Sequence, residues 1–451
     1  MFLKKILCCL SLLLACFCVS ALAQSESVIM PTDIKVIERE AFYGDISIEE
    51  VRIPESTKTI ESLAFANCEN LSEFFCYSRD VSVADDAFLN CGNVRIICYT
   101  GSTIEAYAKE KGFEIGYLDR FEIHSNTVNN GAKGLPITWT VEEGYCDIKD
   151  GKFTYQVFRN GELVETSEEM TSKKYVHTPS DGGDYEIQIT MKNDQNEITM
   201  RSDKIAVSEK LYLGLFEQDN KAETADPVEW IILAADEEKA FVLSKYILKT
   251  DSYFNPAWIK YKYCNWAGSI ITTYRSSNNW YPSASTMRFK TINGVVMVPK
   301  KDGTYISNDD LTKFYHARSW CNDTFYNGAF TDDEKARILL TRNKNEENPS
   351  HSNIDGGPDT YDYVFFLSYN ELNRYLPDIN SRKTANTPVA QAQLGSGKPV
   401  YWWLRTRGGT HVNAACVFAS GSSNGKVWMS GSDVGHDTLG YRPAMWITVG
   451  G

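Results

Sequence analysis

Residue types able to perform catalysis do not gather into a recognised constellation in this chain of 451 residues. Ser423 lies in a Gly-Ser-Ser-Asn-Gly run at residues 421–425, which spells the GxSxG pattern of a nucleophile elbow. That elbow needs a helix after the serine, whereas a turn and a second strand are expected here. Residues 395–398 spell Gly-Ser-Gly-Lys, but Pro399 stands where a phosphate-binding loop has Ser or Thr. We therefore predict that the protein is not an enzyme.

Potential metal ligands are poorly spaced as well. The chain has 6 histidines, and none has a second histidine three or four residues away, so no pair of the HExxH type is expected. Asp355, Asp359 and Asp362 share one polar loop but miss the spacing of an EF-hand. We predict no metal and no cofactor, with calcium as an alternative that no motif supports.

Ligand recognition is the chemistry that the loops between residues 406 and 440 favour. They combine planar donors, amide and carboxylate acceptors and one large aromatic side chain, a mixture suited to binding a carbohydrate or a protein. We expect these loops to be exposed, and the predicted ligand-binding residues in them are Arg407, His411, Asn413, Asn424, Trp428, Asp433 and His436.

Other large side chains in the same part of the chain are expected to fill its core. Along one strand, alternation puts Trp402 and Leu404 on one face and Trp403 and Arg405 on the other. We expect Arg405 and Arg442 to pair with buried carboxylates or carbonyls. The predicted core residues are Trp230, Trp320, Trp402, Trp403, Arg405, Arg442 and Trp446.

The N-terminus predicts export. Two lysines precede a short apolar run, and residues 21–23 are Ala-Leu-Ala, so residues 1–23 have the pattern of a cleavable signal peptide. Residues 13–16, Leu-Leu-Ala-Cys, form a looser lipobox, which leaves a lipid anchor at Cys16 as an alternative. Either way we expect a secreted or cell-surface protein without a transmembrane segment.

The net charge and the cysteine content limit which partners the protein is expected to bind and whether its thiols are expected to be oxidised. The net charge of −13 repels phosphate backbones, so we predict no nucleic-acid partner. Removal of residues 1–23 takes four of the 12 cysteines with it, and the others show neither CxxC pairs nor zinc-ligand spacing. We expect buried free thiols, with disulfides as the alternative in an oxidising compartment.

Residues 28–100 repeat with a period of 23. A single unit is too small to bury its apolar face, so the units must stack as a solenoid with one short strand per coil. The strands are expected at residues 50–53, 73–76 and 95–98. The repeated apolar columns are Ile37, Ile60 and Val83; Phe42, Phe65 and Phe88; Ile48, Leu71 and Val94; and Val51, Phe74 and Ile97.

These coils resemble the BspA-like leucine-rich repeat family, whose units carry Ile-x-x-x-Ala-Phe followed by Asn-Cys and an aliphatic residue. Residues 60–68 with Leu71 fit that pattern closely. Ser102 opens a capping box for a closing helix, and Gly112 is the expected stop. The resemblance implies a short leucine-rich-repeat solenoid over residues 24–118.

Residues 119–209 change character, because strand-like runs alternate there with turn signals such as Asn160-Gly161. Residues 181–185, Asp-Gly-Gly-Asp-Tyr ahead of a strand, look like the tyrosine corner of a sandwich. The segment resembles an immunoglobulin-like or fibronectin-type-III-like all-β domain, which we expect to be a spacer.

Residues 210–451 mix strands with a few helices, two of which start at capping boxes at Thr331 and Ser368. Motifs such as Trp-Trp-Leu-Arg at 402–405 and Tyr-Arg-Pro-Ala-Met-Trp at 441–446 resemble a bacterial secreted domain of unknown function. That domain is similar to C-type lectin-like and formylglycine-generating-enzyme-like folds, which implies an α+β domain with ligand-carrying loops. The calcium-binding triplet of such lectins and the close cysteine pair of such enzymes are missing.

Together these patterns predict a multidomain, noncatalytic adhesion protein that binds an extracellular carbohydrate or protein through a C-terminal lectin-like domain. One alternative is an extracellular enzyme of the formylglycine-generating-like or another kind. The other is an envelope scaffold without a discrete ligand. The sequence leaves the ligand and the oligomeric state open.

Overall fold

The structure is a computed structural model, and it is multidomain and mostly β. Contacts divide the chain into two compact units, the first holding residues up to 124 with 139–175 and 186–203, and the second holding 125–138, 176–185 and 204 onward. The predicted signal segment, Cys16 and His411 lie outside the described residues. The described residues are 26–126, 131–221, 225–253, 290–293, 295–299, 304–307, 317–352, 354, 356–395, 401–410, 413–419 and 421–449.

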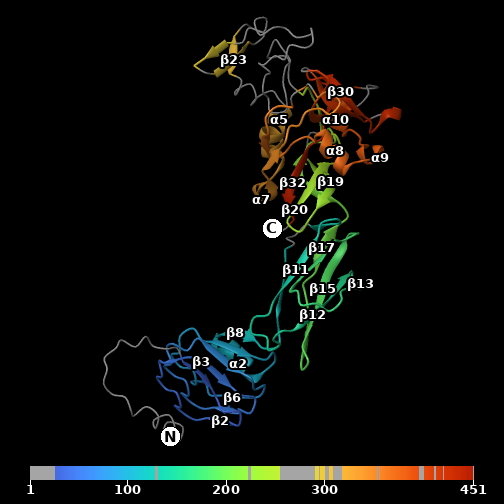
Figure 1. Ribbon diagram of the computed structural model, residues 1–451. Helices are drawn as coiled ribbons and strands as arrows, with labels where there is room; N and C mark the ends of the chain where they lie inside the picture. The colour runs from blue at the N-terminus through green and yellow to red at the C-terminus, as the bar shows by residue number, and fades with distance from the viewer. Residues whose placement is uncertain are drawn as a thin grey trace. The chain divides into compact units, whose positions relative to one another are not determined.

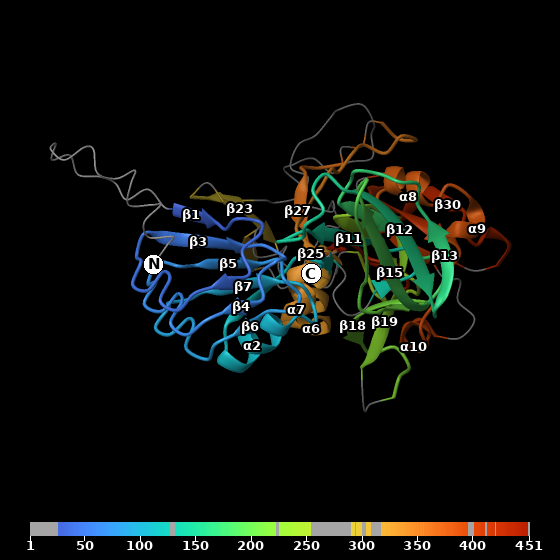
Figure 2. The same cartoon turned by 90° about the horizontal axis from the view of Figure 1, so that it is seen from below.

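The first unit begins with a solenoid, drawn in blue in Figure 1. Its larger parallel sheet has the order β1-β3-β5-β7-β8, and the smaller one has the order β2-β4-β6. Figure 2 shows β1, β3, β5 and β7 side by side. The elements are β1 (Glu26–Ile29), β2 (Val36–Ile37), β3 (Ile48–Ile53), β4 (Thr59–Ile60), β5 (Glu73–Cys76), β6 (Ser82–Val83), β7 (Arg95–Cys98), α2 (Thr103–Lys111) and β8 (Glu114–Tyr117).

The repeated phenylalanines form the spine of the solenoid core. Phe65 stacks between Phe42 and Phe88, with ring centroids 5.2 and 5.3 Å apart. Equivalent residues of successive coils therefore lie one above another, and the three strands expected from the repeat are present as β3, β5 and β7. The structure adds β1 before them and β8 after them to the same sheet.

One of the predicted apolar columns, that of Val51, Phe74 and Ile97, is wrong at its last residue. Phe74 pairs with Ile96, and Phe75 pairs with Ile97, so Ile96 rather than Ile97 continues the inward column. The reason is that one residue fewer separates Val94 from its strand than separates Leu71 from β5. Ile97 points to the opposite side of the sheet, where it packs with Phe75 and Leu118.

Helix α2 closes the solenoid and begins and ends at the predicted residues, but the predicted capping box is only half formed, because the Glu105 carboxylate accepts the Gly101 N–H instead of the Ser102 N–H. The Ser102 side chain accepts a hydrogen bond from the Glu105 N–H, which satisfies one of the free donors of the first turn. Gly112 ends the helix in the left-handed region at φ 74°, where a residue without Cβ avoids strain.

The strands that follow belong to both units, since β11 and β15 each contribute residues to the two of them. Asn160 and Gly161, at φ 51° and 85°, join β12 to β13 in the predicted hairpin. The Tyr185 hydroxyl donates to the Asp181 carbonyl at 3.0 Å. The strands are β9 (Glu122–Ser125), β10 (Gly131–Ala132), β11 (Ile137–Glu142), β12 (Lys152–Arg159), β13 (Glu162–Thr166), β14 (Lys174–His177), β15 (Gly183–Lys192), β16 (Glu197–Arg201) and β17 (Ile205–Ser208).

The rest of the second unit contains two five-stranded sheets. The first has the order β18-β19-β20-β32-β25 and the second β21-β31-β28-β29-β30, with mainly antiparallel pairing. The strands of these sheets are β18 (Leu211–Phe216), β19 (Asp226–Ala235), β20 (Lys239–Ser244), β21 (Lys249–Thr250), β25 (Ile338–Leu339), β28 (Tyr401–Arg407), β29 (Asn413–Phe418), β30 (Val427–Asp433), β31 (Gly440–Tyr441) and β32 (Ala444–Thr448).

Short helices and smaller strand groups complete this unit. Capping boxes open α7 at Thr331 and α8 at Ser368, as predicted. In the described part of the chain, no helix combines the length and the hydropathy that crossing a bilayer requires. These elements are β22 (Lys290–Ile292), β23 (Val295–Pro299), β24 (Tyr305–Ser307), α5 (Ala317–Ser319), the π-helix η1 (Trp320–Phe325), α6 (Tyr326–Ala329), α7 (Asp332–Arg337), β26 (Thr341–Asn343), β27 (Thr360–Asp362), α8 (Tyr369–Tyr375), α9 (Ile379–Arg382), α10 (Pro388–Leu394) and the 3₁₀ turn η2 (Gly421–Ser423).

Candidate functional site

Strand β28 is the rigid base of the candidate site. It lies between β31 and β29, and every residue after Tyr401 is buried. The Trp403 indole Nε1–H donates to the Asp251 carbonyl at 3.0 Å, and the Arg442 guanidinium lies 4.9 Å from the centre of the Trp402 ring. Both faces of the strand are therefore packed, and only its first residue reaches the surface.

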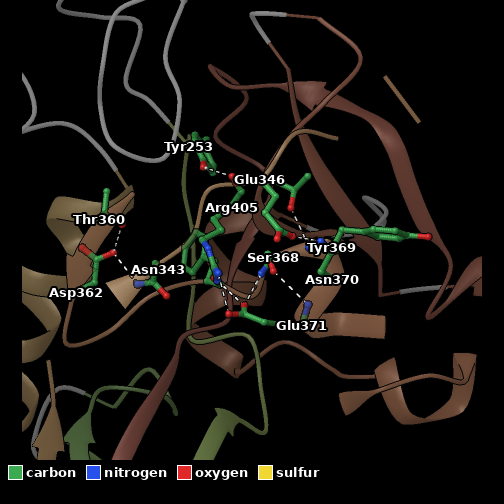
Figure 3. A network of polar contacts seen from close by, with 12 residues as sticks. Tyr253, Asn343, Glu346, Thr360, Asp362, Ser368, Tyr369, Asn370, Glu371 and Arg405 are labelled. Atoms are coloured by element: carbon green, nitrogen blue, oxygen red, sulfur yellow. Dashed lines mark hydrogen bonds and ion pairs between the residues drawn. The ribbon is translucent and has the colours of Figure 1, made fainter. Parts of the chain in front are cut away.

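A buried ion pair attaches helix α8 to this strand. Arg405 Nη2 donates to the Glu371 carboxylate at 2.8 Å, Nη1 donates to its other oxygen, and Nη1 also donates to the Phe366 carbonyl at 2.8 Å. Glu371 in turn accepts the Ser368 N–H at 2.8 Å (Figure 3). One carboxylate thus closes the helix cap and neutralises the buried guanidinium, which fixes α8 against β28.

Arg442 is fully buried, and its guanidinium is hydrogen-bonded to backbone carbonyls. It donates to the Ser244 carbonyl at 2.9 Å and, at longer range, to the carbonyls of Arg382 and Lys245. Burial lowers the pKa of the Arg442 guanidinium, and these carbonyls offset that effect by solvating the cation. The residue therefore ties three chain segments together in the core.

The other expected core residues also lie in the interior of this unit. Trp230 donates its Nε1–H to the Leu213 carbonyl at 2.8 Å. Trp320 meets the Tyr441 ring edge-on at 5.1 Å, and Trp446 stacks on Phe241 at 4.8 Å. Trp446 is half-buried. The buried members of the set are Trp230, Trp320, Trp402, Trp403, Arg405 and Arg442.

Two of the aspartates that were considered as calcium ligands, Asp359 and Asp362, are paired with other side chains of the protein. The buried Asp362 carboxylate accepts hydrogen bonds from Asn343 Nδ2 at 2.8 Å and Thr360 Oγ1 at 2.7 Å (Figure 3), and it also pairs with Arg318. Asp359 pairs with Arg342 at 2.9 Å, and Asp355 lies outside the described residues. The oxygens of Asp362 are thus committed to internal donors, which explains its burial.

The predicted ligand-binding residues do not converge on one point. Asn413 and Asp433 are paired across β29 and β30, and His436 Nδ1 lies 3.0 Å from Ser432 Oγ near the same end of this hairpin. Asn424 lies in the turn at the opposite end. The expected exposure of Arg407 is wrong: it is 1% exposed, because the neighbouring strands and loops cover the last residue of β28.

Trp428 is 41% exposed and belongs to a cluster of three rings on one sheet face. We define the aromatic patch as Tyr401, Phe418 and Trp428. The Tyr401 and Phe418 centroids are 4.8 Å apart, and each lies 6.3 Å from Trp428. Tyr401 pairs with Phe418, and Trp428 pairs with Cys416 two residues away, so the three side chains share a face.

A tight turn holds one edge of the aromatic patch. The Phe418 N–H donates to the Lys426 carbonyl at 2.9 Å, and the Gly425 N–H donates back to the Phe418 carbonyl at 2.7 Å. Gly425 has φ 89°, and a Cβ there would lie 2.1 Å from the Ile379 carbonyl oxygen. Only glycine fits this turn against α9, so the rings are presented on a fixed backbone with the exposed Lys426 at their border.

Sequence reasoning found Trp428 and missed Tyr401 and Phe418. The usable signal was the Asn424-Gly425 turn, because a hairpin closing there sets Phe418 opposite Lys426 and therefore diagonal to Trp428. Tyr401 could not be placed in the same way, since its pairing with Phe418 joins segments linked by no short turn.

The cysteines of the described chain are free thiols rather than disulfides. Cys321 and Cys416 of the second unit are fully buried, and desolvation raises the pKa of Cys416 to about 12. Cys264 lies outside the described residues. The seven described free thiols are Cys68, Cys76, Cys91, Cys98, Cys146, Cys321 and Cys416.

Two segments of this chain are similar to described families. Residues 15–130 match the family described as BspA type Leucine rich repeat region (6 copies), which confirms the predicted repeat family. Residues 314–449 match the Domain of unknown function (DUF6273), in line with the predicted C-terminal resemblance. No curated protein and no solved structure matches the chain. BspA-type repeats are typical of bacterial surface proteins.

Proposed function

We propose that this is an exported, noncatalytic binding protein that holds a carbohydrate on the aromatic patch of its C-terminal domain. The repeat match suggests a surface or adhesion-type protein. In this proposal residues 1–23 direct export, with a lipid anchor at Cys16 as the alternative. Residues 119–209 are an immunoglobulin-like spacer, and residues 210–451 are a lectin-like domain.

The aromatic patch is the observation that carries the proposal. A tryptophan exposed to 41% beside two half-buried rings leaves apolar surface in water, and a ligand that covers this surface would gain free energy from its burial. Sugar rings present C–H faces that pack on aromatic faces, while their hydroxyls need polar partners at the rim. The Tyr401 hydroxyl, the Trp428 indole N–H and the Lys426 ammonium are the polar groups that this patch offers.

The test is a glycan array probed with the full mature chain, followed by titration of the best glycan. We expect Trp428→Ala to weaken binding about tenfold, since about 1.4 kcal/mol of lost stacking corresponds to that factor. Tyr361→Ala is the matched control, because Tyr361 is an aromatic residue of the same unit that is 61% exposed away from the patch.

Two results would contradict the proposal. One is equal glycan affinity of the wild-type chain and Trp428→Ala, with Tyr361→Ala unchanged. The other is an empty glycan array combined with capture of a purified host or bacterial surface protein, which favours a protein ligand. Turnover of the bound glycan on the array would instead favour the enzyme alternative.

A further inference from the structure

A second group of side chains lies in the first unit, on strands β9 and β11. Glu122 and His124 are two residues apart on β9 and therefore point to the same side. Glu142 is the last residue of β11, the strand next to β9 in its sheet. Two neighbouring strands thus present one imidazole and two carboxylates together.

The distances among these groups are those of ligands around one ion. His124 Nε2 lies 3.6 Å from a Glu122 carboxylate oxygen and 3.3 Å from a Glu142 carboxylate oxygen. Both contacts are ion pairs when His124 is protonated, and the longer one exceeds the usual N–H···O range of roughly 2.7–3.2 Å. Donor atoms about 2.0–2.1 Å from a tetrahedral zinc ion are roughly 3.4 Å apart, which matches both separations.

The donor chemistry selects the class of ion. One imidazole nitrogen and two carboxylate oxygens suit Zn²⁺ and similar first-row divalent ions rather than the all-oxygen shell of calcium. Two carboxylates held within 4.8 Å of each other repel, and a divalent cation between them removes that repulsion. The exposed fractions of the side chains, 76% for Glu122, 51% for His124 and 70% for Glu142, leave solvent free to complete the coordination.

An adjoining cavity supplies the independent geometric support. All three residues line a cavity of about 790 Å³ that is formed entirely within the first unit. Its wall also carries Arg95, Arg120 and Arg201 together with Glu114, Glu143 and Asp203, so the further charges of the cavity are balanced. We infer that Glu122, His124 and Glu142 bind a divalent cation of the zinc class, with its open coordination position toward this cavity.

Cobalt is the probe for this site, because its spectrum reports the ligand type. The full mature chain, without a polyhistidine tag, is titrated with Co²⁺ while its visible d–d absorption is recorded. We expect one Co²⁺ per chain, no thiolate charge-transfer band, and displacement by Zn²⁺. His124→Ala and Glu142→Gln should each weaken Co²⁺ binding at least tenfold.

The control variant is His436→Ala, which removes an exposed histidine of the second unit and should leave Co²⁺ binding unchanged. Far-UV circular dichroism verifies that each variant is folded, and Glu142→Gln keeps the size of its exposed side chain. Unchanged affinity in both His124→Ala and Glu142→Gln would overturn the assignment. A thiolate band, or loss of binding in His436→Ala alone, would do so as well.

Discussion

Single thiols of this protein differ from ordinary cysteines in their ionisation. Burial raises the pKa of Cys76 and of Cys416 to about 12 in each case. The thiolate is the reactive form, so these side chains are almost entirely unreactive at neutral pH. Their contribution is packing, Cys76 in the solenoid core and Cys416 in the core of the second unit.

This ionisation predicts a labelling pattern. Cys76 and Cys416 should resist iodoacetamide at pH 8 in the folded protein and react fully in denaturant. Peptide mass spectrometry of quenched samples measures the labelled fraction of each thiol. Cys91, which is half-buried, is the internal comparison and should react sooner than either. Rapid labelling of Cys416 in the native state would show that the core of the second unit opens readily.

Residue roles that depend on local sequence were predictable, and roles that depend on strand pairing were not. The caps at Ser102 and Ser368 involve hydrogen bonds within three residues, so a short motif specifies them. Arg407 was expected to be an exposed donor because it follows the predicted core strand, yet the strands on either side of β28 bury it. Of the three residues of the aromatic patch only Trp428 was predicted, because the positions of Tyr401 and Phe418 beside it depend on strand pairing.

At the scale of elements, helix α2 depends on one carboxylate at its start. Glu105 accepts hydrogen bonds from Lys109 Nζ at 2.8 Å, from the Gly101 N–H at 2.6 Å and from the Tyr117 hydroxyl at 2.9 Å. The bond from Lys109 is the largest of the causes that lower the pKa of Glu105. The ionised carboxylate thus connects the helix to β8 and to the turn before it.

The sign of the pH effect follows from that lowered pKa. Ionised Glu105 stabilises the folded state fully above its unfolded-state pKa of about 4.3. This stabilisation is lost as the pH falls through the lower pKa that Glu105 has in the folded state. Glu105→Gln should therefore cost roughly 1–2 kcal/mol at pH 7 and almost nothing near pH 2. Urea unfolding at the two pH values measures the difference. Glu110→Gln, at an exposed position of the same helix, should show no such pH dependence.

The contact between β8 and the loop after β11 depends on a glycine, because Gly116 has no side chain to fill the space. A Cβ on Gly116 would lie 2.6 Å from Tyr145 Cδ2, so the ring occupies space that only glycine leaves. The Tyr145 hydroxyl donates to Glu73 and accepts from Arg95 at 2.9 Å. Nearby, the Asp147 N–H donates to the Leu118 carbonyl at 2.9 Å.

Gly116→Ala should displace this ring and loosen the loop, at a cost of roughly 1–3 kcal/mol for overpacking. Hydrogen exchange followed by mass spectrometry should show faster exchange at residues 145–147. Gly328→Ala adds a Cβ that meets no atom within 4 Å and should leave this loop unchanged. If exchange at the loop matches the wild type in both variants, Tyr145 does not hold it.

The coils show how far periodicity alone can place an element. Strands β3, β5 and β7 follow from the 23-residue period, because three copies of one pattern constrain each other. Ile96 and Ile97 are adjacent and equally apolar, so hydropathy could not decide which of them faces inward, and only pairing with Phe74 does. Strand β8 lacks the repeat motif and joins the sheet by pairing with β7.

At the scale of the whole molecule, sequence composition and residue contacts divide the chain at different places. Changes of composition placed boundaries near residues 118 and 209, whereas contacts divide the chain inside residues 119–209. A strand as long as β15 satisfies one alternation pattern along its length while its two ends contribute to different units. Sequence patterns report on each strand, and the contact division depends on all of them together.

Two cores that share no residue predict two unfolding events. Phe65 is fully buried in the solenoid core, and Phe365 is fully buried in the core of the second unit. Multidomain proteins commonly depart from two-state unfolding, because each core can lose its packing independently. We therefore expect two transitions in differential scanning calorimetry, with Phe65→Ala lowering one and Phe365→Ala lowering the other.

Each of these truncations should cost about 3–5 kcal/mol in its own transition, the usual range for removing a buried phenylalanine ring. Leu163→Ala, at a position that is 52% exposed, is the matched control and should move neither transition. One common transition shifted equally by Phe65→Ala and Phe365→Ala would mean that the two units unfold as one cooperative body. The strands that both units share, β9, β11, β14 and β15, are the segments through which such coupling would act.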